Sequence, residues 1–211
     1  MSNNVPRVLF HETIQCLVAA LEARDPYTRN HSKRVADLTL DLGCRAGLQV
    51  LDLELIHLAA LVHDIGKIGV PDQILRKPGP LLPREWELFR QHPEIGQNIL
   101  GRSLHLEKVA ELVLHHHERW DGNGYPEGLK GERIPIGSRI IALADGVDAM
   151  TSARAYRPPL SWLQCKREIY IAPDFPGHEI RINLGRLGDG RGGRALVGDK
   201  EARGGSAAFA G

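Results

Sequence analysis

Histidines and aspartates stand at the ends of apolar helical segments in this chain, where they could bind a metal ion. His63 and Asp64 end a strongly apolar run, and His116 continues the apolar face set by Val109 and Val113. A carboxylate or an imidazole turned toward the core needs a partner that offsets the cost of its burial, and a divalent cation is one such partner. Mixed imidazole and carboxylate donors suit Fe, Mn, Zn or Ni better than Ca or Mg alone.

Seven groups share such a position at a helix end or on a core-facing helix side. They are His31, His63, Asp64, His92, His116, His117 and Asp145. This number of donors is enough for two metal ions. Residue types alone leave an alternative open, in which each histidine is an independent structural residue satisfied by a backbone carbonyl or a carboxylate. The neighbouring His115, four residues after Glu111, is expected to lean toward solvent.

The elements that must position these groups are predicted to be helices. Apolar residues recur at spacings of three and four, and no segment alternates convincingly at period two, so the first 160 residues are expected to be all-α. The expected helical segments are 10–21, 35–42, 53–64, 85–91, 94–100, 106–117 and 137–150. Gly43 is expected to stop the second segment and Gly66 to provide a left-handed C-cap for the third, whereas residues 122–135 are expected to form a loop.

The bulk composition restricts the partners and the compartment. There are 27 Lys and Arg residues against 26 Asp and Glu residues, so the net charge of +1 gives no reason to expect DNA or an anionic membrane as a partner. Three cysteines without a CxxC pair argue against a disulfide framework and favour a reducing cytoplasm. No run is apolar and long enough for a membrane span, and no signal peptide pattern opens the chain.

Two motifs resemble those of the HD-GYP family, a branch of the HD phosphohydrolases. They are HDIGKIGVPD at residues 63–72 and HHERWDGNGYP at residues 116–126. The similarity begins near Glu22 with ARDPYTRNHSKRVA and continues through IPIGSRIIALADGVDAMTSARAYRP to about Leu160. The resemblance implies an all-helical HD-domain bundle with a metal centre in its core. It also implies hydrolysis of the bacterial second messenger cyclic di-GMP to linear pGpG, to GMP or to both.

The resemblance assigns roles to individual residues. The metal ligands would be the seven groups already named, with Asp64 as the bridge between two divalent ions, Fe or Mn. A water shared by the ions would lose a proton, and the hydroxide would attack phosphorus in line. Catalysis would rest on Asp64 and on Lys67, which is placed to contact the scissile phosphate. Some family members hold a third metal with a glutamate where this chain has Tyr27, so two metals are expected.

Further contacts are implied around this centre. Arg154 and Arg157 would join Lys67 in binding phosphate, for which guanidinium geometry is well suited. Asp148, about one turn after Asp145, would orient a metal ligand or the Lys67 ammonium.

The GYP tripeptide is implied to contact a protein partner. In relatives this loop is implicated in docking to diguanylate cyclase (GGDEF) domains, so Gly124, Tyr125 and Pro126 are candidate contacts. The alternative is a purely structural loop with Trp120 and Tyr125 packed beneath it.

The chain departs from the family pattern in two places. Ala153 stands where family members commonly have an aspartate, which removes a carboxylate near Arg154. After Leu160 the sequence resembles the family's closing helices only faintly. We therefore expect an HD-GYP domain over residues 10–160 with degenerate or missing C-terminal helices, a divergent segment over 161–184, and a disordered tail over 185–211, where nine of 27 residues are glycine. A frame shift near residue 160 would explain this change, and translating the other two frames of the coding DNA checks it.

Two other functions compete with cyclic di-GMP hydrolysis. One is an HD phosphohydrolase that acts on another nucleotide, because the residues that would recognise guanine cannot be identified from the sequence. The other is a catalytically weak module that senses a cyclic dinucleotide or docks to a GGDEF domain. The complete ligand set favours catalysis, whereas Ala153 and the divergent tail favour the module.

Overall fold

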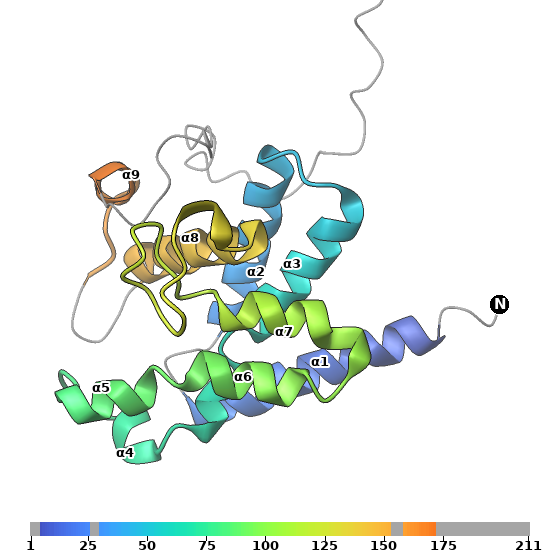
Figure 1. Ribbon diagram of the computed structural model, residues 1–211, viewed down its shortest axis with the longest axis horizontal. Coiled ribbons are helices and arrows are strands. Elements are labelled where there is room, and N and C mark those ends of the chain that lie inside the picture. The colour runs from blue at the N-terminus through green and yellow to red at the C-terminus, as the bar shows by residue number, and fades with distance from the viewer. Residues whose placement is uncertain (1–4, 26–29, 153–157, 172–211) are drawn as a thin grey trace, which may run out of the picture.

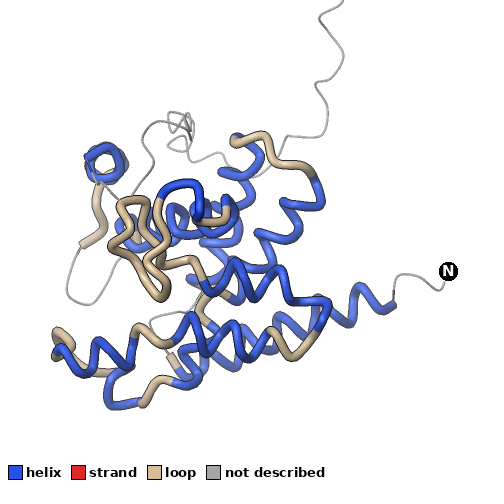
Figure 2. Tube along the Cα trace, viewed as in Figure 1, coloured by secondary structure: helices blue, strands red, loops and turns tan. Residues whose placement is uncertain are grey.

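A computed structural model describes residues 5–25, 30–152 and 158–171 of the chain. Within these ranges the chain consists of helices and connecting loops, with no strand (Figure 2). The expectation of an all-α fold is therefore confirmed for the described part of the first 160 residues.

Helices appear at all seven expected places. The α-helices are α1 (Val5–Arg24), α2 (His31–Arg45), α3 (Val50–Val62), α4 (Asp72–Leu75), α5 (Pro83–Phe89), α6 (His92–Leu100), α7 (Glu107–Leu114), α8 (Ile136–Thr151) and α9 (Trp162–Ile171). In the described ranges the 3-10 turns are η2 (Ile65–Gly69), η3 (Leu104–Leu106) and η4 (Gly131–Arg133). The expected loop over 122–135 is present except for η4.

The helices lie in two groups with α7 between them. In Figure 1, α1, α6 and the α4–α5 segment occupy one side of the molecule, and α2, α3 and α8 the other. Helix α7 contacts α6 on the first side and α3 and α8 on the second. The turn η2 packs on α6 and α1, and so carries the end of α3 across to the first group.

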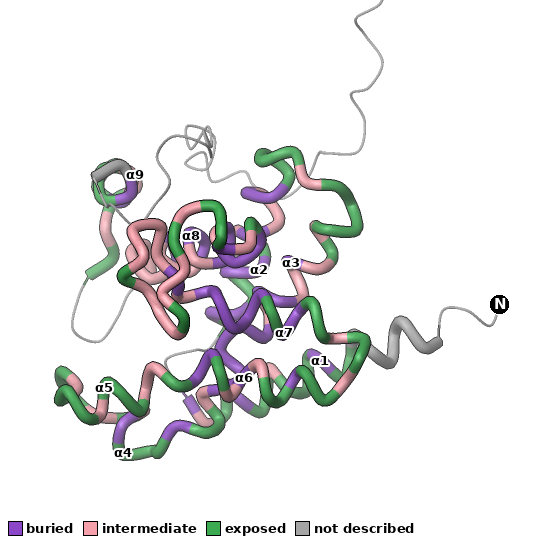
Figure 3. Tube along the Cα trace, in the orientation of Figure 1, coloured by how far each residue is buried: buried purple, intermediate pink, exposed green. Residues whose placement is uncertain are grey.

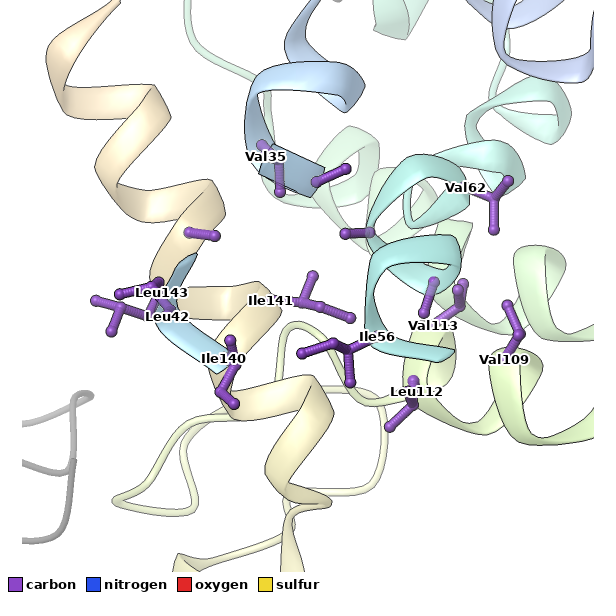
Figure 4. Packing of buried hydrophobic residues seen from close by; sticks show 14 of the residues in the cluster. Val35, Leu42, Ile56, Val62, Val109, Leu112, Val113, Ile140, Ile141 and Leu143 are labelled. Atoms are coloured by element: carbon purple, nitrogen blue, oxygen red, sulfur yellow. The ribbon is translucent and has the colours of Figure 1, made fainter. Parts of the chain in front are cut away.

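One apolar core holds these elements together. It includes Val35 and Leu42 of α2, Ile56 of α3, Val113 of α7 and Ile141 of α8, each at most 2% exposed (Figure 4). Buried segments follow α3, α7 and the start of α6 toward the middle of the molecule, whereas α5 is largely exposed (Figure 3). The end of α3, helix α7 and the start of α6 therefore lie in the interior.

Two glycines have roles other than the expected helix stops. Helix α2 continues through Gly43 to Arg45, and a Cβ on Gly43 would lie 2.7 Å from Cδ1 of Ile56, so this glycine allows close packing of α2 on α3. Gly66 has no positive φ and is not a left-handed cap. A Cβ on Gly66 would overlap the carbonyl oxygen of His92. The glycine therefore lets η2 approach the first residue of α6.

Helix α9 follows the expected end of the HD-GYP domain at residue 160. Cys165 and Ile169 of α9 are 0% and 8% exposed and belong to the apolar core, and α9 contacts α8. At least the first part of the segment expected to be a divergent remnant thus contributes to the core. Residues 172–184 and the expected tail over 185–211 lie outside the described part of the chain.

Candidate metal centre

The seven candidate ligands come from five places in the fold. His31 and His92 are the first residues of α2 and α6, and His63 and Asp64 lie between α3 and η2. His116 and His117 follow the end of α7, and Asp145 lies inside α8. The structure brings all seven together in the interior.

Six of these residues form two groups of possible metal-ligand atoms. One group is His92, His116 and His117, and the other is His31, His63 and Asp145. Within each group the donor atoms lie within 4.8 Å of one another. The described part of the chain contains these two groups of three or more such donors.

Asp64 lies between the two groups, and each of its carboxylate oxygens faces one of them. Oδ1 is 3.6 Å from His92 Nε2, whereas Oδ2 is 3.4 Å from His63 Nε2 and 3.8 Å from His31 Nε2. The residue is only 2% exposed. A carboxylate placed in this way has the geometry to bridge two cations.

Hydrogen bonds to the backbone set the tautomer of three of the imidazoles. Nδ1 of His63 donates to the carbonyl of Ala60 at 2.7 Å, and Nδ1 of His116 donates to that of Val113 at 2.6 Å. His92 makes the same bond to Phe89 at 2.9 Å. Because a carbonyl only accepts, the proton of each neutral ring is on Nδ1, and Nε2 presents a lone pair to the centre.

Each of these three Nε2 atoms presents a lone pair and carries no proton. A bound cation would coordinate these lone pairs. His63 Nε2 is buried and has no hydrogen-bond partner among the described residues. His92 Nε2 and His116 Nε2 are 3.4 Å apart, so two lone pairs face each other. Buried acceptors in such an arrangement are costly unless a positive charge lies between them. The residues present therefore fit bound divalent metals.

The electrostatics of His92, His116 and His117 agree with this fit. Burial lowers the pKa of His92 to about 3 and that of His117 to about 4. Burial also holds the pKa of His116 well below its ordinary value. These rings are neutral near pH 7, as metal ligands must be.

His31 is surrounded by negative charge. Burial opposes a charge on its ring, but hydrogen bonds to Asp145 and Asp148 outweigh burial and raise the pKa of His31 to about 9. His31 Nε2 is 3.3 Å from Asp145 Oδ1 and Nδ1 is 2.8 Å from Asp148 Oδ2. Asp148 also accepts from Arg34 Nε at 2.5 Å. Asp148 thus holds one edge of the His31 ring and leaves Nε2 directed at the centre.

Lys67 contacts the carboxylate that lies between the two groups. Its Nζ is 2.6 Å from Asp64 Oδ2, and its side chain is 15% exposed. Burial opposes the charge on Asp64, but Lys67 and the surrounding histidines keep the pKa of this carboxyl well below its usual range. Lys67 therefore places a positive charge beside the Asp64 carboxylate, on a side chain that is partly exposed to solvent.

Arg24 fixes the turn that carries Lys67, a contact that sequence reasoning missed. Its guanidinium donates to the carbonyls of Lys67, at 3.3 Å, and Val70, at 2.6 Å, and also to that of Ile68. It forms an ion pair with Asp72 at 2.9 Å. No periodicity relates α1 to η2, so the sequence offered no signal for this interaction.

The GYP loop covers the His117 side of the centre. The Tyr125 ring stacks on that of His117 at 4.9 Å, and its backbone N–H donates to the His117 carbonyl at 3.2 Å. The Arg90 guanidinium lies 4.5 Å from the Tyr125 ring centroid. A Cβ on Gly124 would overlap the backbone of Glu118, so only glycine allows this close approach.

Glu118 anchors the same loop from beneath. Only 6% exposed, it accepts the backbone N–H groups of Glu127, at 2.7 Å, and Leu129, at 3.0 Å. Sequence reasoning did not single it out.

His115, expected to lean toward solvent, is 8% exposed. Helix α7 ends at Leu114, and the turn that follows directs His115 Nδ1 to Glu111 O, at 3.0 Å, and Nε2 to Glu127, at 3.3 Å.

Four residues named from the sequence lie outside the described part of the chain. They are Tyr27, Ala153, Arg154 and Arg157.

Among the described helices, none combines the length and apolar character that a membrane-spanning helix requires.

Comparison with known proteins identifies related sequences over most of the chain. The family model of the HD domain matches residues 15–165. A cyclic di-GMP phosphodiesterase of Thermotoga maritima is 46% identical over 160 residues, covering 75% of this chain and 44% of the relative. A 3'3'-cGAMP-specific phosphodiesterase of Vibrio cholerae is 40% identical, covering 75% of this chain and 31% of the relative. The chain thus spans less than half the length of either protein.

A solved structure shares the fold. An HDG"Y"P protein from Bdellovibrio bacteriovorus has a TM-score of 0.59 with 21% sequence identity, over 71% of this chain and 49% of the other. At 21% identity the similarity supports the helical HD fold alone. The chemistry has to be argued from the residues of the site.

Proposed function

Since this chain belongs to the HD domain family, we propose that it is a metal-dependent phosphodiesterase that hydrolyses cyclic di-GMP to linear pGpG, to GMP or to both. The Thermotoga maritima relative carries this activity in its name and is 46% identical over the matched region. Because the chain spans 44% of that relative, the assignment rests on the site as well as on the similarity.

The position of Asp64 carries the proposal. One carboxylate oxygen faces His92 of the first donor group, and the other faces His31 and His63 of the second. His31, His63, Asp64, His92, His116, His117 and Asp145 would hold two divalent ions, with Fe and Mn as the metals expected. When bound, such a pair supplies an activated water nucleophile and neutralises charge on the phosphoryl oxygens.

The residues around the ligands would orient the substrate and the ligands themselves. The Lys67 ammonium, which contacts Asp64 and is partly exposed, would bind a phosphoryl oxygen of the scissile bond. Asp148 would keep the His31 ring in position through its Nδ1 bond. Arg154 and Arg157 remain proposed phosphate contacts on the strength of the sequence motif alone.

A second candidate substrate is 3'3'-cGAMP. The Vibrio cholerae relative that is 40% identical is named as specific for this cyclic dinucleotide. Both substrates present the same phosphodiester to the site and differ in one purine base. The choice between them therefore concerns the bases and leaves the proposed role of the metals unchanged.

Docking of GGDEF domains through Gly124, Tyr125 and Pro126 stays a prediction, as does the cytoplasmic location. Each of these three residues is partly exposed, which leaves surface for a partner. Tyr125 also stacks on His117, so a partner bound to the loop would act close to a proposed ligand. The domain limits at residues 160 and 184 likewise remain predictions.

Product analysis with metal-loaded protein tests the function. Chain purified without oxygen and loaded with Fe or Mn is incubated with cyclic di-GMP and with 3'3'-cGAMP, and products are resolved by chromatography. Wild type and the control Asp41→Asn, which alters a surface ion pair with Arg45, should form product with two metals per chain, whereas Asp64→Asn should form none. Folded, metal-loaded wild type that cleaves neither substrate would overturn the proposal and leave a nucleotide-sensing module as the alternative.

A further inference from the structure

Two aromatic rings on α5 stack on each other, and one of them, Trp86, is exposed. The rings of Trp86 and Phe89 lie 5.5 Å apart at an interplanar angle of 10°. Trp86 is 44% exposed, and Phe89 is partly buried. A helix that exposes a large flat ring beside a second parallel ring presents a surface suited to stacking.

This stack leads directly into the candidate metal centre. The Phe89 ring lies 5.2 Å from the ring of His92, which is 0% exposed. Lys67 Nζ lies 5.7 Å from the Phe89 centroid while it contacts Asp64 at 2.6 Å. A phosphate group held by Lys67 would therefore have an aromatic surface next to it on the α5 side.

We propose that Trp86 and Phe89 form a stacking platform for a purine base of the nucleotide substrate. The inference rests on the proposed function, because it takes the scissile phosphate to lie at Lys67 and Asp64. In a dinucleotide one ribose separates each phosphate from a base, so a base reaches beyond the phosphate site to the surface around it. Of the described residues around Lys67, Phe89 and Trp86 offer that base parallel ring faces.

The exposed apolar side chains of α5 and its N-cap differ in their suitability for a planar ligand. The other exposed apolar side chains of this region, Leu82 and Leu88, are 60% and 44% exposed and are not aromatic. Phe89 contacts both the His92 ring and the Lys67 ammonium, and Trp86 stacks on Phe89. Stacking on aromatic rings together with a neighbouring cation is how proteins hold bases and their phosphates.

Binding measurements that need no turnover test the platform. The metal-loaded full chain is titrated with the bis-phosphorothioate analogue of cyclic di-GMP, which resists hydrolysis, and with the matching analogue of 3'3'-cGAMP. Trp86→Ala should weaken binding about tenfold. Leu88→Ala, which removes an equally exposed side chain from the same helix, should leave the affinity within about twofold of the wild type.

The fluorescence of Trp86 gives a second measurement. The chain has three tryptophans, so the double substitution Trp120→Phe, Trp162→Phe leaves Trp86 alone. A purine stacked on the indole should quench its emission in step with binding, whereas a ligand that binds without changing this emission overturns the platform.

The outcomes separate this inference from the proposed function. If the wild type binds either analogue and Trp86→Ala binds equally well, the platform is wrong and the phosphodiesterase proposal stands. If the folded, metal-loaded wild type neither binds the analogues nor cleaves the substrates, both proposals are wrong. Weaker binding in Trp86→Ala alone supports the platform.

Discussion

Gly66 lies against the backbone of His92, so closely that a Cβ at residue 66 would overlap the His92 carbonyl oxygen. This contact joins the turn after Asp64 to the first turn of α6. Asp64 Oδ1 then lies 3.6 Å from His92 Nε2. The glycine therefore sets the distance between these two candidate ligands.

Gly66→Ala should therefore both destabilise the fold and weaken metal binding. The added methyl must push two backbone segments apart, and overpacking of this kind costs about 1–3 kcal/mol. Gly69→Ala is a matched control, since the nearest atoms to its Cβ would belong to the Ile95 side chain, Cδ1 at 2.9 Å and Cγ2 at 3.1 Å, and not to the backbone. Denaturant unfolding and metal analysis measure both effects, and a Gly66→Ala protein with wild-type stability and metal content would contradict the argument.

Local sequence patterns predicted the helices, and the family resemblance named seven candidate ligands that the structure brings together. Spacings of three and four placed His116 on the apolar face set by Val109 and Val113, and all three are at most 1% exposed. The resemblance to the family's motifs then implied that His31 and Asp145, far apart in the sequence, would meet. His31 Nε2 lies 3.3 Å from Asp145 Oδ1. The first of these features depends on residues within one helix, and the second on the order of the motifs that resemble the family's.

Features that depend on two distant backbones were not predicted. Gly66 was expected to cap α3, whereas its actual neighbour is His92 in another helix. His115 was assigned to solvent on a helix expected to reach residue 117, whereas α7 ends at Leu114. Arg24 and Glu118 bind backbone groups, which carry no residue-type signal in the sequence.

Lys67→Met should lower turnover while leaving the metals in place. Methionine keeps most of the apolar stem and removes the ammonium that contacts Asp64 at 2.6 Å. Loss of one charged contact to a developing phosphoryl charge lowers kcat by about 100-fold. Lys77→Met removes a lysine that pairs with Glu85 at 2.5 Å and serves as the control. Steady-state kinetics and metal analysis decide the question, and unchanged kcat in the Lys67 variant would exclude the lysine from catalysis.

Asp148→Asn should weaken metal binding without removing a ligand. The carboxylate accepts the Nδ1 proton of His31 at 2.8 Å and is held by Arg34. An amide can present its N–H side to the ring and is a weaker acceptor, so metal affinity should fall about 10- to 100-fold. Competition with a chelator measures this fall against Asp41→Asn. Equal affinity in the two variants would show that Asp148 has no part in positioning His31.

Glu118→Ala should release the GYP loop from the centre. Its buried carboxylate accepts two backbone N–H groups, from Glu127 and Leu129, and these donors would lose their partner. Leaving these partly buried donors unpaired costs up to about 1–3 kcal/mol, and the loss should appear first as local opening of the loop. Hydrogen exchange should speed up at the two amides, whereas Glu132→Ala, which changes an exposed side chain of the same loop, should leave their rates unchanged. Because Tyr125 stacks on His117, the released loop should also expose that ring, and turnover should fall together with protection. Faster exchange with full activity would mean that the loop is anchored by Glu118 but does not contribute to the centre.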